Sequence, residues 1–209
     1  MSAAHMPVLS EKVPGDRILV KQAVLLVLGV LALAVSAKVQ VAMWPSPVPI
    51  TLGTFAVLSI GAAYGPRLGL ATILAYMLIG SLGFDVFANS SAELNGISYM
   101  MGSTGGYLLG YVLATLALGF AARKAWDRNV FTMVGAMLVG NALIYVPGLL
   151  WLSTWIETTG RLDLAKYSSL ADQTLVWGLT PYVIGDGMKL ALAALLFPLL
   201  WSLVGKARG

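Results

Sequence analysis

The chain consists of long apolar runs separated by short polar connections, which is the pattern of a protein that crosses a membrane several times. Six runs are candidate transmembrane helices: about 18–37, 50–64, 68–84, 105–122, 130–152 and 179–204. Each spanning helix needs roughly 20 apolar residues, so the second and third runs are short. The pattern predicts an all-α membrane protein with six spans in a single domain, 1–209, in which residues 1–17 form a polar leader.

A tight turn is expected between the second and third runs, at Gly65-Pro66-Arg67. Proline ends a helix, and glycine tolerates the backbone reversal that follows. The two short runs are therefore expected to form a pair of helices that are thin, distorted or buried by protein rather than lipid.

Composition supports the membrane assignment and narrows the chemistry. The chain is 58% hydrophobic and 11% charged, with a mean hydropathy of +0.84, whereas about a quarter of the residues of a soluble domain are charged. It has no cysteine, and its single histidine, His5, lies in the leader. Disulfides and thiolate metal sites are thus excluded, and we expect no metal site in the membrane region.

The distribution of basic residues predicts the orientation. Six spans place both termini on one side, which then carries Lys12, Arg17, Lys21, Arg67, Arg123, Lys124, Arg128, Lys206 and Arg208. The other side has Lys38, Arg161 and Lys166. By the positive-inside rule both termini are cytoplasmic, so the net charge of +4 reflects topology and not a nucleic-acid partner. The outer connections are the long ones, and they indicate a ligand site that opens outward.

Two charges lie close together in the last run, Asp186 and Lys189. An ionised side chain at the centre of a membrane helix costs about 2.5–3.5 kcal/mol, so such a pair needs a reason. The spacing i, i+3 places both on one helix face. If Thr180 caps the helix and Pro181 opens it, both charges lie in the outer half of the membrane.

The pair has two readings. It could be a structural ion pair that holds the bundle together, or a ligand site in which Lys189 donates to an anion while Asp186 accepts N–H groups or orients the lysine. We favour the ligand site, because two adjacent ions in lipid cost more than packing requires.

Three further segments have open interpretations. The proline-rich segment 44–54 is either a lid at the outer mouth or a rigid loop that starts the second helix. Glycines at 102, 105, 106 and 110 permit close helix packing or offer backbone N–H groups to an anion, and packing is the favoured role for Gly106 and Gly110. Tyr145 and Trp151 fit an interfacial aromatic belt or the walls of a pocket.

Four segments in order resemble the BioY family, the biotin-specific substrate-binding (S) components of energy-coupling factor (ECF) transporters. They are Pro47-Val48-Pro49-Ile50-Thr51-Leu52-Gly53-Thr54-Phe55, Gly65-Pro66-Arg67-Leu68-Gly69, Thr104-Gly105-Gly106-Tyr107-Leu108-Leu109-Gly110 and Gly185-Asp186-x-x-Lys189. Together they cover essentially the whole membrane region.

The resemblance implies a six-helix S-component bundle that binds biotin near the outer surface. The acidic and basic residues of the family's last helix fall on Asp186 and Lys189, and Asn95, in the outer connection between runs 68–84 and 105–122, is the candidate contact for the ureido ring. The expected biotin-binding residues are Asp186, Lys189, Asn95, Tyr145, Trp151, Gly102 and Gly105.

The resemblance also implies partners. S-components use small residues of the first helix to dock a transmembrane coupling subunit, for which Ala32 and Ser36 are the candidates. Two ATPase subunits would supply the energy, because this chain has no Walker motif and needs no cofactor of its own. The expected location is the bacterial inner membrane.

Two other functions compete with this reading. One is an ion-coupled secondary transporter of a small carboxylate-bearing substrate, with Asp186 as a proton carrier, although no repeat relates the two halves of the chain. The other is a membrane enzyme that uses the pair as acid and base. This function is the least favoured of the three, because the sequence shows no nucleophile or group of metal ligands near the pair.

Overall fold

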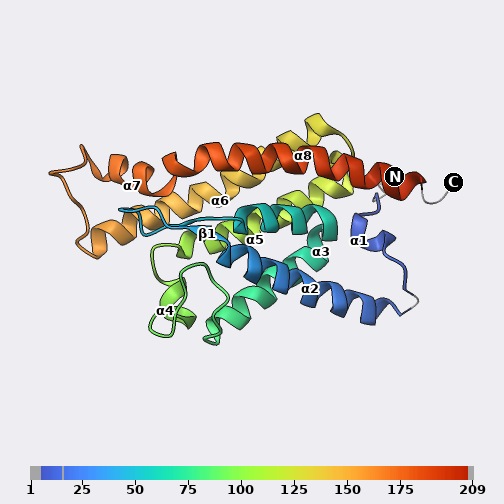
Figure 1. Cartoon of the computed structure of the whole chain (residues 1–209), viewed down its shortest axis with the longest axis horizontal. Coiled ribbons are helices and arrows are strands. Elements are labelled where there is room, and N and C mark those ends of the chain that lie inside the picture. The colour runs from blue at the N-terminus through green and yellow to red at the C-terminus, as the bar shows by residue number, and fades with distance from the viewer. Residues whose placement is uncertain (1–5, 16, 207–209) are drawn as a thin grey trace, which may run out of the picture.

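The computed structural model is a bundle of long helices that lie side by side (Figure 1). It describes residues 6–15 and 17–206, so His5 and the rest of residues 1–5, Asp16 and residues 207–209 lie outside the described part. The helical elements are α1 (Leu9–Lys12), α2 (Ile18–Lys38), α3 (Gly53–Ser81), α4 (Gly96–Met100), α5 (Gly105–Arg123), η1 (Trp126–Arg128), α6 (Val130–Thr158), α7 (Leu170–Gly178), η2 (Thr180–Tyr182) and α8 (Val183–Lys206). A short antiparallel hairpin, β1 (Gln40–Val41) with β2 (Ile50–Thr51), joins α2 to α3.

The second and third predicted spans form the single long element α3, which is interrupted at Gly65. Gly65 has φ of 75°, a left-handed value that glycine adopts without strain. A Cβ built at Gly69 would lie 3.6 Å from the Cα of Gly61, whereas eight residues of a straight helix span about 12 Å. The helix therefore folds back on itself, and the predicted turn at this position is confirmed. Within the described part of the chain, five helices are long and apolar enough to cross a membrane, with α3 counted once and residues 170–204 counted as one continuous helix.

The last predicted span begins differently from the expectation. Thr180 does not cap it, because its hydroxyl donates to the Leu175 carbonyl (3.1 Å) and Leu179 holds the cap position. Pro181 lies in the short turn η2, and α8 itself begins at Val183. Asp186 consequently lies in the first turn of α8, where the positive end of the helix dipole favours a carboxylate.

Helix α5 lies at the centre of the bundle, between α3 and α6. Its glycines permit this close approach: a Cβ at Gly106 would lie 2.3 Å from the Pro147 carbonyl oxygen, and one at Gly110 would lie 2.6 Å from the Cα of Ile144. The packing role predicted for these two glycines is thus confirmed. Helix α6 runs through Pro147 and continues to Thr158, six residues beyond its predicted end.

The two ends of the bundle differ. At one end α1 lies near the C-terminal end of α8 (Figure 1), and Arg123 forms an ion pair with Glu11 (2.5 Å). At the opposite end lie α4, α7 and the β-hairpin, which cover the helices with loops (Figure 1). The charged pair of α8 belongs to this second, loop-covered half.

Candidate ligand-binding site

Asp186 and Lys189 form a buried ion pair between α8 and its neighbours. Lys189 Nζ lies 2.8 Å from Asp186 Oδ1, and the side chains are 14% and 9% exposed. Lys189 also donates to Thr54 Oγ1 of α3 at 3.2 Å. The other carboxylate oxygen, Asp186 Oδ2, accepts a short hydrogen bond from the Tyr145 hydroxyl of α6. Both carboxylate oxygens are therefore engaged, and the carboxylate orients the ammonium group.

The pair lies at one side of a cavity of about 640 Å³, its open mouth included. This size is within the range of small-molecule sites. All the long helices contribute to its wall, together with the β-hairpin connection and the loop that follows α3. The lining residues are Ala37, Val48, Pro49, Thr51, Thr54, Tyr76, Phe87, Ala88, Tyr99, Thr104, Tyr107, Leu108, Tyr111, Tyr145, Gly178, Tyr182, Asp186 and Lys189.

Six tyrosines dominate this wall. Their rings provide apolar area, while several hydroxyls hold the loops above the cavity. Tyr107 donates to the Gly178 carbonyl (2.9 Å), and Tyr182 donates to the Val48 carbonyl (2.5 Å). The proline-rich segment is thereby fixed to the turn before α8, and Ser46 adds a hydrogen bond to the Trp177 carbonyl (2.6 Å). The cavity thus combines an aromatic wall with a single ion pair.

The loop after α3 closes another part of the wall through Phe87. This side chain is 1% exposed, stacks on Tyr99 with ring centroids 4.8 Å apart and meets Tyr76 edge-on. Gly80 makes room for it, because a Cβ there would lie 2.1 Å from the ring. The aromatic cluster fixes this segment of the loop against the bundle.

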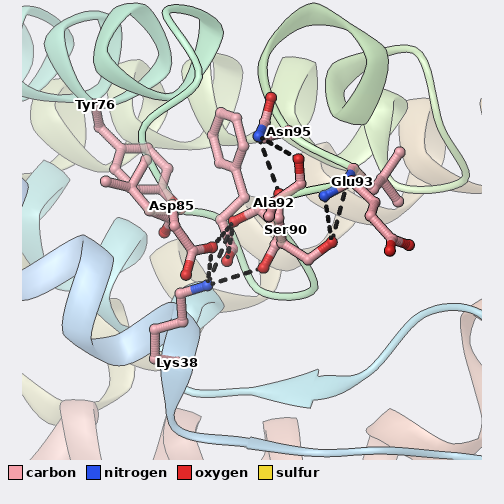
Figure 2. Close-up of polar contacts among 11 residues, drawn as sticks. Lys38, Tyr76, Asp85, Ser90, Ala92, Glu93 and Asn95 are labelled. Atoms are coloured by element: carbon pink, nitrogen blue, oxygen red, sulfur yellow. Dashed lines mark hydrogen bonds and ion pairs between the residues drawn. The ribbon is translucent and has the colours of Figure 1, made fainter.

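Lys38, at the end of α2, contacts the same loop after α3 through Asp85 and Ser90 (Figure 2). Its Nζ lies 2.5 Å from Asp85 Oδ1 and donates to the Ser90 hydroxyl at 3.3 Å. The Ser90 hydroxyl in turn donates to Asp85 Oδ1 (2.6 Å). The hydrogen bonds from Lys38 and Ser90 lower the pKa of the Asp85 carboxyl. Because Ala37 and Phe87 line the cavity, this contact joins two parts of the wall.

The Lys38–Asp85 contact predicts an acid-sensitive loop. A carboxyl whose pKa is lowered by folding stabilises the folded loop above its unfolded pKa of about 3.9, and this contribution disappears as the pH falls through the lower folded value. Hydrogen exchange of residues 85–91, corrected for the intrinsic rate, should be slower than in Asp85→Asn at neutral pH and equal to it at acid pH. A difference that persists at acid pH would contradict this role of Asp85.

Comparison with known proteins identifies the family. The BioY family model matches residues 6–206. The chain belongs to the BioY family. The "probable biotin transporter BioY" of Pyrococcus horikoshii is 30% identical over 176 residues, 84% of this chain and 93% of that protein. The "biotin transporter BioY" of Thermotoga maritima is 31% identical over 165 residues, 77% of this chain and 88% of that protein.

A solved structure has the same fold. The crystal structure of the S-component for biotin from an ECF-type ABC transporter superposes with a TM-score of 0.71 and 19% identity, over 91% of this chain and 95% of that chain. The all-helical S-component fold expected from the sequence is thus confirmed. As a BioY protein with several apolar helices, the chain is a multi-pass membrane protein of a transporter family.

Asn95, the expected ureido contact, lies in the loop before α4 and is not among the residues that line the cavity. Figure 2 shows its amide turned toward its own loop, where Nδ2 donates to the carbonyls of Ser91 (3.0 Å) and Ala92 (3.3 Å). In this structure the Nδ2 group of Asn95 shapes the loop.

The other expected residues divide into two groups. Tyr145 lines the cavity beside Asp186 and Lys189. Trp151 instead donates from Nε1 to the Gly102 carbonyl (2.8 Å), and a Cβ at Gly105 would lie 2.1 Å from the Met100 carbonyl oxygen. Gly102, Gly105 and Trp151 thus pack together at the start of α5, and none of the three is among the residues that line the cavity. On α2, Ala32 is exposed and Ser36 half-buried.

Sequence reasoning missed most of the aromatic wall. Tyr107 and Tyr111 of α5, four residues apart, lie on one helix face and both line the cavity. Thr54 belongs to the segment 47–55 that resembles the family, but nothing in the sequence indicates its direct contact with Lys189. The available signal was the occurrence of tyrosine and threonine, which carry hydroxyls, within otherwise apolar runs.

Proposed function

We propose that this protein is the high-affinity biotin-binding subunit of an uptake transporter, and that it captures biotin at the loop-covered end of the bundle. Biotin presents one carboxylate at the end of an apolar chain and a fused ring system with a ureido group. The cavity presents one ammonium group and an aromatic wall. This match between the one ammonium group of the buried ion pair and the one carboxylate of biotin is the observation that carries the proposal, and the relatives named biotin transporters support it.

Lys189 is the residue that would receive the biotin carboxylate. Of its two contacts, the one with Thr54 is the longer, at 3.2 Å against 2.8 Å for Asp186. An incoming carboxylate can therefore take the donor now directed at Thr54, while Asp186 keeps the ammonium in place. The fused rings would then lie among the tyrosines and Phe87, where aromatic faces offer large contact area.

Transport would depend on partner subunits. We expect a transmembrane coupling subunit, which docks on α2 near Ala32 and Ser36, and two ATPase subunits that hydrolyse ATP. The exposed apolar side chains of α2, among them Leu28, Leu31 and Val35, offer a surface for such a partner or for lipid. The bacterial inner membrane would hold the assembly.

Ion-coupled transport is a less suitable function for this site. A proton carrier must bind and release its proton freely, whereas both oxygens of Asp186 are engaged, by Lys189 and by Tyr145. Protonating Asp186 would break the contact that orients Lys189. Binding of an anionic vitamin requires no such step.

The ligand can be identified directly. The protein is purified from cells grown with biotin, denatured, and the released small molecules are identified by mass spectrometry. We expect biotin in an amount comparable to the protein, and much less from Lys189→Met prepared in the same way. Recovery of a different vitamin would overturn the specificity, and failure of the purified protein to bind added biotin would overturn the function.

A further inference from the structure

A second, smaller cavity lies directly behind the ion pair. Its volume is about 190 Å³ with its openings included, and it shares Thr54, Asp186 and Lys189 with the main cavity. Its remaining walls come from α3, α6 and α8, and most of these side chains are apolar. They are Phe55, Leu58, Met137, Asn141 and Leu190.

Asn141 is the unusual member of this lining. Its Oδ1 atom is buried and accepts no hydrogen bond from the residues that the structure describes. A buried amide without a partner costs free energy, the more so at membrane depth, where lipid offers no replacement. Buried polar groups in native proteins are paired in nearly all cases, and an exception indicates a bound water molecule or ion.

The register of the helices explains why this amide is near the lysine. Asn141 and Tyr145 are four residues apart and share one face of α6. Asp186 and Lys189 share one face of α8. Tyr145 meets Asp186, and one turn further along the two helices Asn141 and Lys189 line the same small cavity.

The chemistry of the small cavity selects water as its occupant. A cation is disfavoured because the Lys189 ammonium forms part of the wall. An organic group would find mostly apolar side chains and little space. Water needs two to four polar partners and room for a single molecule, and this cavity offers a lysine donor, an amide oxygen, the Thr54 hydroxyl and Asp186.

We propose that one buried water molecule bridges Lys189 Nζ and Asn141 Oδ1, so that Asn141 is a positioning residue for the ligand-binding lysine. An ammonium group has three N–H donors, and the described contacts with Asp186 and Thr54 use two of them. The water takes the third, on the side away from the ligand. Asp186 and the water then hold the ammonium from two directions, and the donor directed at Thr54 is presented to the main cavity.

The proposal rests on the proposed function, because its effect is measured on the binding of biotin. Replacing Asn141 with leucine keeps a similar shape and removes the amide. The melting temperature should change little, because the substitution removes the buried amide oxygen together with its water and leaves the Lys189–Asp186 ion pair in place. Affinity should fall at the same time, because the lysine loses one of the contacts that orient it.

The test measures the dissociation constants of biotin and of biotinamide, which lacks the negative charge, for the wild type and Asn141→Leu. We expect the affinity of Asn141→Leu for biotin to be about tenfold lower than that of the wild type, which corresponds to the loss of one hydrogen bond to a charged group. For biotinamide we expect less than about a twofold change. An equal loss for both ligands, or a loss accompanied by a lower melting temperature, would show a structural role and overturn the proposal.

Two controls separate the possible causes. Ser59 Oγ is also buried without a hydrogen-bond partner among the described residues, but Ser59 lines neither cavity, so Ser59→Ala should leave the affinity for biotin unchanged. In a protein that already carries Lys189→Met, adding Asn141→Leu should change the dissociation constant of biotin by less than about twofold, because the lysine that Asn141 positions is absent. If the wild type binds no biotin, the proposed function fails; if it binds and Asn141→Leu binds equally well, this inference alone fails.

Discussion

Replacing Lys189 with methionine should remove most of the affinity for biotin and little of the affinity for its uncharged analogue biotinamide. The substitution preserves an unbranched apolar side chain and deletes the ammonium group. Loss of one partner of a buried, hydrogen-bonded charge pair costs about 2–5 kcal/mol, which corresponds to a loss of roughly 30-fold to several thousand-fold. The remaining Asp186 carboxylate would add repulsion toward biotin, since it would then face the cavity without its cation. Titration calorimetry with both ligands measures the difference.

A lysine outside the site provides the control. Lys124 follows α5 and is exposed, so Lys124→Met should leave both dissociation constants unchanged. Equal losses of biotin and biotinamide affinity in Lys189→Met would mean that this lysine does not contact the carboxylate.

Replacing Asp186 with alanine should markedly lower the stability of the protein. Asp186→Ala leaves the Lys189 ammonium buried without its counter-ion, and it also removes the acceptor of the Tyr145 hydroxyl. Breaking a buried ion pair from one side typically costs about 3–5 kcal/mol. The melting temperature of the purified protein in detergent should fall clearly, and biotin binding should weaken with it because the lysine is no longer oriented.

The pair at the end of α2 offers a matched comparison. Asp85 also contacts a lysine, but its side chain is 61% exposed against 9% for Asp186. Exposed ion pairs contribute about 0–1 kcal/mol, so Asp85→Ala should change the melting temperature much less. Similar shifts for the two variants would contradict the distinction between a buried and a surface pair.

The apolar pattern of the sequence was sufficient for the fold, because lipid requires long helices with internally satisfied backbones. The bounds of α2 and α5 agree with the predicted runs to within one residue. Gly65 was readable as a turn because proline follows it. Helix α7 is too short and too polar to show as an apolar run, although Ser169 and Asp172 form a recognisable helix start.

The candidate site was only half predictable. Charged residues are so rare in apolar runs that Asp186 and Lys189 can be recognised as candidate site residues from the sequence alone. Tyr145 was expected as a wall of the pocket, but its contact with Asp186 and the contact of Thr54 with Lys189 were not predictable, because these residues lie on other helices and the sequence does not show which helix faces meet. Asn95 was placed in the site by its loop, yet the amide satisfies carbonyls of that same loop, a local choice that only the structure reveals.

The most direct test of the account is an experimental structure of the purified protein with biotin bound. We expect the carboxylate of biotin within hydrogen-bonding distance of Lys189 Nζ, the fused rings among the tyrosines of the main cavity, and Asp186 still in contact with the lysine. Biotin bound elsewhere, or bound with its carboxylate directed away from Lys189, would contradict it.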